Sequence, residues 1–95
     1  MSKSISMVGA GTSAYIEVNP QEQNFKLSIS VRPAAGWTGN WSLQYRLGKE
    51  WFYDPSKFEK TAADFDGLAT PIRAVRLVTG SGSSGEITLE VLQGA

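Results

Sequence analysis

Alternation of apolar and polar residues is the strongest pattern in this chain, and its period is that of a β-strand. Over residues 25–32 every second side chain is apolar and the ones between are polar. The same alternation returns over 41–47 and 86–91, and a fourth strand is expected over 72–79. Each strand should therefore bury one face and expose the other, as in an antiparallel sheet. The side chains expected to face the core are Phe25, Leu27, Ile29, Val31, Trp41, Leu43, Tyr45, Leu47, Val75, Leu77, Ile87, Leu89 and Val91.

Weaker patterns fill the segments between these strands. Residues 14–18 predict a strand that ends at a turn, and residues 50–53 predict a short strand paired with the one before it. Residues 54–57 favour one helical turn, with the Asp54 side chain capping its N-terminus. Phe65 is expected to enter the core from a loop. No segment has the periodicity of a long helix.

About seven or eight short strands, separated by Gly, Pro, Asn and Ser, predict an all-β fold. The expected architecture is a small antiparallel β-sandwich, immunoglobulin-like or jelly-roll-like, with at most one helical turn near 55–60. Residues 14–95 should form this single domain. Residues 1–13 are small and polar, and we expect a flexible N-terminal arm there. Gly80–Gly85 is expected to be a flexible hairpin loop between the last two strands.

Composition narrows the functional classes. The chain has 95 residues and a mass of 10.3 kDa, which allows one domain. It contains neither cysteine nor histidine, which excludes disulfides, thiolate or imidazole metal sites, and catalytic Ser-His-Asp or Cys-His groups. Nine Lys and Arg balance nine Asp and Glu, so no net charge attracts nucleic acid or an anionic membrane. We expect contact with other molecules rather than catalysis, and no cofactor.

The chain shows no sequence signal for a membrane or for secretion. No apolar run approaches the roughly 20 residues of a membrane span. The apolar stretch after the first residues is too short and too polar for a signal peptide. The chain begins with Met and ends two residues after a strand-like segment, and we expect a complete small soluble protein.

Three motifs resemble functional sites without the context that such sites need. Gly80–Gly85 and Gly9–Ala14 match glycine patterns of dinucleotide-binding loops, but strands rather than helices are expected after both. Asp54, Asp64 and Asp66 lie close in sequence, as paired catalytic carboxylates would require, and Asp64 and Asp66 are also candidate calcium ligands. Neither the alternating acidic loop of a calcium site nor a deep pocket is indicated. We therefore predict no nucleotide, catalytic or metal site.

Aromatic residues carry more information about contact. Trp41, Tyr45 and Phe52 are expected in the core. Trp37 lies between glycines on an expected loop, where exposing a large ring is costly without a use. Trp51 and Tyr53 should share one face of a short strand. Exposed Trp and Tyr side chains anchor protein interfaces and also stack on sugars, so the predicted contact residues are Trp37, Trp51 and Tyr53.

The C-terminal half resembles small virion proteins of tailed phages. The segment 41–51, WSLQYRLGKEW, is similar to a Trp-x-Leu-x-Tyr-x-x-Gly-x-x-Trp hairpin of those proteins. The segments 71–77, PIRAVRL, and 86–93, EITLEVLQ, resemble their closing strands. The resemblance implies a β-sandwich structural component of a phage particle, either a capsid decoration protein or a tail or neck accessory protein.

Together these observations favour a non-enzymatic virion structural protein, located in the virion after assembly in the host cytoplasm. A small core and unpaired sheet edges favour a homo-oligomer, with a trimer preferred, that also binds other virion proteins such as coat or tail subunits. Two alternatives stay open. One is a carbohydrate-binding or adhesin module that uses the exposed aromatics, and the other is an immunoglobulin-like protein-interaction domain.

Overall fold

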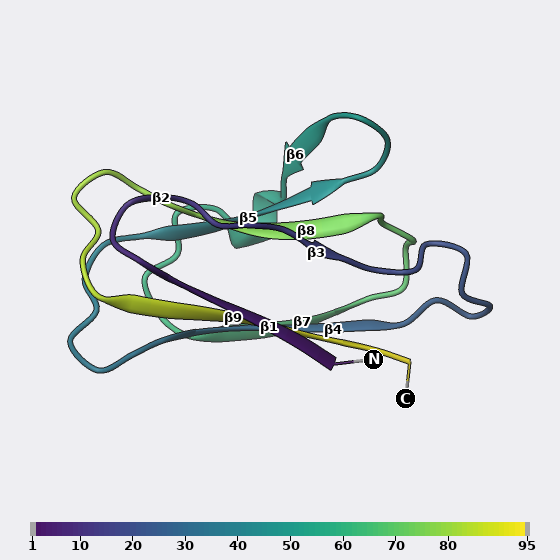
Figure 1. The fold of residues 1–95 in the computed structure, drawn as a ribbon, viewed down its shortest axis with the longest axis horizontal. Coiled ribbons are helices and arrows are strands. Elements are labelled where there is room, and N and C mark those ends of the chain that lie inside the picture. Colours follow the sequence, from purple (N-terminus) through teal and green to yellow (C-terminus); the bar gives the residue numbers. More distant parts are fainter. Residues whose placement is uncertain (1, 95) are drawn as a thin grey trace.

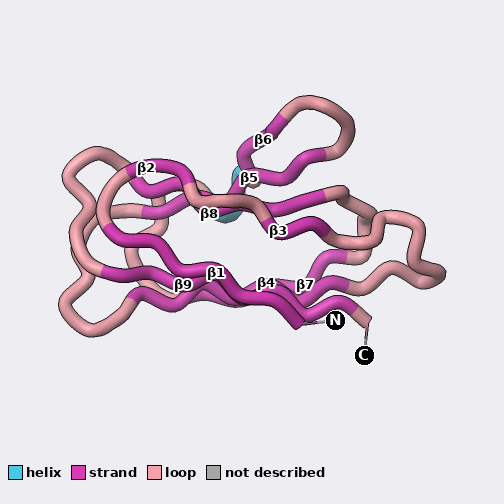
Figure 2. Tube along the Cα trace, in the orientation of Figure 1, coloured by secondary structure: helices cyan, strands magenta, loops and turns pink. Residues whose placement is uncertain are grey.

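The computed structural model describes residues 2–94 and shows two antiparallel sheets packed face to face (Figures 1 and 2). The first sheet contains, in spatial order, β1 (Ser2–Val8), β9 (Glu86–Gln93), β4 (Leu27–Pro33) and β7 (Asp64–Leu68). The second contains β2 (Gly11–Thr12), β8 (Ala74–Thr79), β5 (Trp41–Arg46) and β6 (Trp51–Tyr53), and β3 (Ile16–Glu17) also pairs with β8. One short 3₁₀ helix, η1 (Pro55–Lys57), follows β6. The predicted all-β sandwich is confirmed.

The last two strands, β8 and β9, lie in different sheets. In immunoglobulin sandwiches the final two strands are neighbours in one sheet. Here β9 pairs instead with β1 and β4, which fits the jelly-roll-like alternative better. The predicted hairpin at Gly80–Gly85 is therefore wrong, because this segment crosses between the sheets. It is also held in place, since Ser84 and Thr38 exchange two backbone hydrogen bonds of 2.8 and 2.9 Å.

The core consists mostly of the alternating side chains that the sequence predicts. Phe25, Leu27, Ile29, Val31, Trp41, Leu43, Val75, Leu77, Ile87, Leu89 and Val91 are all buried. Trp41 is fully buried, and its indole Nε1 donates a hydrogen bond of 3.0 Å to the carbonyl oxygen of Ala62. Tyr45 is half-buried and Leu47 is exposed, because the end of β5 extends past the sandwich with β6 (Figure 2).

Residues 2–13 differ from the flexible arm that the sequence predicted over 1–13, of which Met1 lies outside the described residues. Residues 2–8 form β1, which pairs with β9 along its whole length, from Ser2 opposite Leu92 to Val8 opposite Glu86. Residues 11–12 form β2, which pairs with β8 in the other sheet. Ile5 and Met7 pack against the core, with Ser6 between them. Two inward apolar residues were too few to reveal the alternation in the sequence.

Phe65 also departs from its predicted place in the core. It lies on β7 opposite Ser30, on the outward face of the first sheet, and is 81% exposed. The positions of β7 that alternate with it are Asp64 and Asp66, whose carboxylates pair with Lys57 of η1. Leu68, on the same side of β7 as the two aspartates, packs against the core, so apolar burial and charge pairing together favour this orientation, and the Phe65 ring faces outward.

The local predictions around η1 are confirmed. Asp54 caps η1, and its Oδ1 accepts a hydrogen bond of 2.9 Å from the backbone N–H of Ser56. β6 pairs antiparallel with β5, as expected for residues 50–53. The strand predicted over 14–18 is reduced to two paired residues, β3, with Val18 still buried. Within residues 2–94 no helix has the length and hydrophobicity needed to span a membrane.

Candidate contact surface on the β5–β6 hairpin

The β5–β6 hairpin rises away from the first sheet and carries several large side chains that the sandwich does not cover (Figure 1). Leu47 is 53% exposed, Phe52 50%, Tyr53 48% and Phe58 47%. We call these four residues the hairpin surface, although it includes both faces of β6 and Phe58, which follows η1 and contacts Tyr53. Clustered exposed apolar groups on a small domain mark sites of contact with other molecules.

Register explains how the hairpin displays its aromatic rings. Trp51 lies opposite Arg46 and Tyr53 opposite Gln44, so these residues share the outer face of the sheet. Phe52 lies opposite Tyr45 and points to the other face. The predicted shared face of Trp51 and Tyr53 is thus confirmed, whereas the core position predicted for Phe52 is wrong. The Tyr53 and Phe58 rings meet edge to face, with centroids 5.0 Å apart.

Trp51 is half-buried beneath two arginines. The guanidinium carbon of Arg76 lies 4.0 Å from the Trp51 ring centroid, and that of Arg46 lies 5.6 Å from it. Arg46 also lies 5.0 Å from the centroid of the Tyr15 ring, which is itself 5.8 Å from that of Trp51. These are cation–π distances. A sugar that stacked on the Trp51 face covered by Arg76 would have to displace that guanidinium.

The two arginines lack acidic partners. Arg76 Nε donates a hydrogen bond of 2.7 Å to the Gln44 side-chain oxygen. Among residues 2–94 no carboxylate lies within 4.0 Å of the Arg46 or Arg76 guanidinium. The outer face beside the hairpin therefore carries two positive charges that contact aromatic rings and, for Arg76, the neutral Gln44 amide, but no carboxylate among the described residues.

A hydrogen bond between Tyr45 and Asp54 anchors the base of the hairpin to η1. The Tyr45 hydroxyl donates to Asp54 Oδ2 over 2.6 Å. Burial raises the pKa of Tyr45, and the hydrogen bond to Asp54 raises it further, so the phenol remains a donor. Burial also raises the pKa of Asp54, but hydrogen bonds from Tyr45 and Ser56 and the charge of Lys57 outweigh it and hold that pKa below its usual value. Beside this bond lies an open cleft of about 330 Å³.

The acidic residues considered as calcium ligands instead hold lysines. Lys57 Nζ lies 3.2 Å from Asp64 Oδ2 and 3.5 Å from Asp66 Oδ2, and Lys60 Nζ lies 3.4 Å from Asp64 Oδ2. Burial lowers the pKa of Lys57, but its hydrogen bonds and charge interactions with the two carboxylates prevail and raise it. These ion pairs connect η1 to β7 and give the acidic residues a structural role. Within the described residues, no group of three or more acidic side chains is placed to hold a metal ion.

Trp37, the third predicted contact residue, does not join the hairpin surface. It lies in the connection between β4 and β5, half-buried and packed against the core. Its indole Nε1 is buried without a hydrogen-bond partner. Gly85 passes so close that a Cβ there would meet the Trp37 Cα at 3.0 Å. Trp37 does lie on a loop, as expected, but its ring is partly covered, because the crossing segment 80–85 packs close to it.

Sequence reasoning missed Arg46, Arg76 and Phe58 as members of this region. Arg46 and Arg76 sit at outward positions of alternating strands, where polar residues carry no distinguishing signal. Phe58 follows a helical turn, and its exposure depends on where that turn docks. The sequence did show many aromatic residues near 51–58, which indicated a contact region there but not which side chains belong to it.

Comparison with known proteins shows a similarity of fold. No protein-family model matches the chain, and no curated protein does. A solved structure described as showing that Bacillus endospore appendages form a novel family of disulfide-linked pili is similar in fold, with a TM-score of 0.56 and 16% sequence identity. The similarity covers 96% of this chain and 82% of that one. It supports the two-sheet architecture of this chain.

Proposed function

We propose that this protein is a non-enzymatic structural subunit that associates with further copies of itself, using the hairpin surface as a contact. The observation that carries the proposal is the exposure of Leu47, Phe52 and Tyr53 on the projecting hairpin and of Phe58 beside it. Removing these side chains from water would be favourable, and a 95-residue domain gains stability from such burial. The fold similarity to a pilus-forming appendage protein adds support for an assembling role.

Any such assembly of this chain would lack disulfide links. The similar appendage proteins are described as disulfide-linked, whereas this chain contains no cysteine. Apolar burial, cation–π contacts and strand edges would have to hold neighbouring copies together. We therefore expect association that depends on concentration and resists reducing agents.

A tailed-phage particle is the specific assembly that we propose, with a trimeric subunit bound to coat or tail proteins in the virion. The support for this narrower proposal is the resemblance of residues 41–51, 71–77 and 86–93 to small virion proteins. Residues 41–51, which carry part of that resemblance, belong to the β5–β6 hairpin that projects from the sandwich.

Light scattering coupled to size exclusion, run over a wide concentration range, tests the proposal. We expect a mass that rises above 10.3 kDa, with a plateau at three times that mass if the trimer is right. The double variant Phe52→Ser, Phe58→Ser should weaken association by at least tenfold, and Thr61→Ala, an exposed polar position in the same loop, should not. A wild-type protein that remains monomeric at every concentration would refute the proposal.

A further inference from the structure

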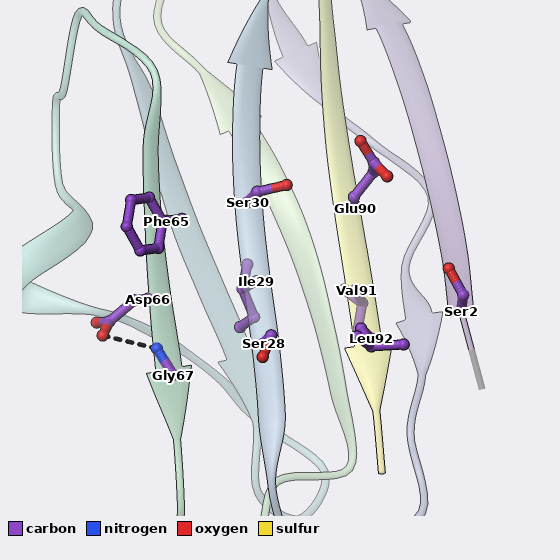
Figure 3. Close-up of a pocket in the computed structure, with 10 residues that line it drawn as sticks. All are labelled: Ser2, Ser28, Ile29, Ser30, Phe65, Asp66, Gly67, Glu90, Val91 and Leu92. Carbon is purple, nitrogen blue, oxygen red and sulfur yellow. Dashed lines mark hydrogen bonds between the residues drawn. The ribbon is translucent and has the colours of Figure 1, made fainter. Parts of the chain in front are cut away.

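The outer face of the first sheet combines a projecting ring with a hollow beside it (Figure 3). Phe65 on β7 lies opposite Ser30, and Gly67, two residues on, lies opposite Ser28. The hollow has a volume of about 340 Å³. Figure 3 shows small side chains along its floor, because glycine and serines occupy the outward positions beside the ring.

We propose that this face is a second self-association surface, on which two copies pack face to face with their strands antiparallel. This inference rests on the proposed self-assembly of the chain. The ring of Phe65 and the hollow beside Gly67 lie on the same face. The Phe65 ring of each copy could therefore enter the hollow of the other copy. A two-fold interface satisfies both copies at once, because the same surface is used twice.

The charges at the two ends of this face complement each other in the antiparallel arrangement. Lys26, exposed just before β4, lies at one end, and Glu86, exposed at the start of β9, lies at the other. Neither has an ion-pair partner among residues 2–94. Between them Arg32 and Glu90 pair with each other and leave the middle neutral. Antiparallel packing places the Lys26 end of one copy over the Glu86 end of the other, whereas parallel packing sets like charges together.

The size of the face predicts a weak interaction. Four strands spaced by about 4.8 Å, each about seven residues long, cover an area of roughly 400 Å². A standard stable interface buries about 800 Å² on each partner. Contact through this face alone should therefore be seen only at high protein concentration.

The face and the hairpin surface lie on different sides of the molecule. β6 rises from the second sheet, while β1, β9, β4 and β7 form the opposite layer (Figure 2). In the trimer that we propose, the hairpin surface joins three copies, and the outer face of the first sheet would link each of them to a copy in a further trimer. Once copies are joined through one surface, the second surface meets its partner at a high effective concentration, so the two weak contacts together bind more tightly than either alone.

Sedimentation velocity at high protein concentration tests the inference. The hairpin variant Phe52→Ser, Phe58→Ser should retain weak dimerisation, and adding Phe65→Ser should weaken that dimer by at least tenfold. Because Phe65 is exposed, thermal melting of the variant should match that of its parent, which checks that it folds. A Phe65 variant that dimerises as its parent does would overturn this inference and leave the proposed function intact, whereas a wild-type monomer at all concentrations would overturn both.

Charge reversal provides a second test that leaves the ring in place. Lys26→Glu should weaken the dimer several-fold at low salt, because both ends of the face then carry negative charge. Lys26→Glu combined with Glu86→Lys should restore it. Failure of the double reversal to restore dimerisation would overturn the antiparallel arrangement.

Discussion

Shortening the connection between β8 and β9 should destabilise the fold strongly. If Gly80–Gly85 closed a hairpin within one sheet, replacing its six residues with Asn-Gly would remove flexible chain and stabilise the protein. The segment instead joins two sheets. Packed sheets lie about 10 Å apart, and two residues between Thr79 and Glu86 span at most about 11 Å when fully extended. An Asn-Gly connection would therefore be too short both to cross between the sheets and to reverse the chain direction.

The same replacement removes backbone hydrogen bonds outside the strands. Ser84 exchanges two with Thr38, and Gly85 accepts one of 3.1 Å from the Gly9 N–H. At about 1 kcal/mol each, these three bonds contribute about 3 kcal/mol, before any strain in the strands. For a domain of this size that corresponds to a melting temperature lower by about 12 °C or more.

Thermal unfolding followed by circular dichroism measures the effect of the Asn-Gly replacement. Ser81→Ala is the matched control, because Ser81 is exposed in the same loop, and it should melt as the wild type does. A shortened variant that melts at or above the wild-type temperature would show that the crossing between sheets does not constrain this segment.

Three further predictions concern stability. Gly39→Ala should lower the free energy of unfolding in urea by about 2 kcal/mol or more, because Gly39 has φ of 126° and faces the Ser83 side chain. The control Gly48→Ala should be nearly neutral, since Gly48 has open space around it. Equal losses of stability in the two variants would contradict this. Trp37→Ala should lower stability by about 3 kcal/mol, because the ring packs against the core, and an unchanged melting curve would indicate an exposed ring instead. The hydrogen bond with Lys57 is the main cause that lowers the pKa of Asp64 from 3.8. The stability that ionised Asp64 contributes is therefore complete above pH 3.8 and is lost as the pH falls through the lower pKa of the folded state. Urea midpoints measured from pH 6 to 2 should fall less for Asp64→Asn than for wild type, and parallel profiles would contradict this.

The sequence by itself determined where most strands lie and which side of each is buried. Alternation is a local property, because successive side chains of a strand point to opposite faces whatever the strand pairs with. Leu27, Ile29 and Val31 were therefore identified as core residues without knowledge of the neighbouring strands. The cap at Asp54 was equally accessible, since it depends on a side chain and a backbone N–H two residues apart.

Of the predicted contact residues, the sequence placed Trp51 and Tyr53 on one face of a short strand, and the register confirms this. It could not show that arginines cover Trp51, because Arg76 comes from a strand distant in the sequence. It also placed Trp37 on an exposed loop, whereas the ring is half-buried and packs against the core. Loop composition does not reveal which other segment packs over a side chain.

Only the tertiary structure decided which strands share a sheet and which apolar residues remain exposed. The alternation in β8 and β9 is the same whether they are neighbours or lie in opposite sheets, so the hairpin expected at Gly80–Gly85 had no local evidence against it. Phe65 alternates with Asp64 and Asp66, and its direction depends on long-range contacts of the opposite side of β7: Lys57 pairs with both aspartates, and Leu68 packs against the core. Strand periodicity fixes two faces but not which one meets the core, and long-range packing and charge pairing make that choice.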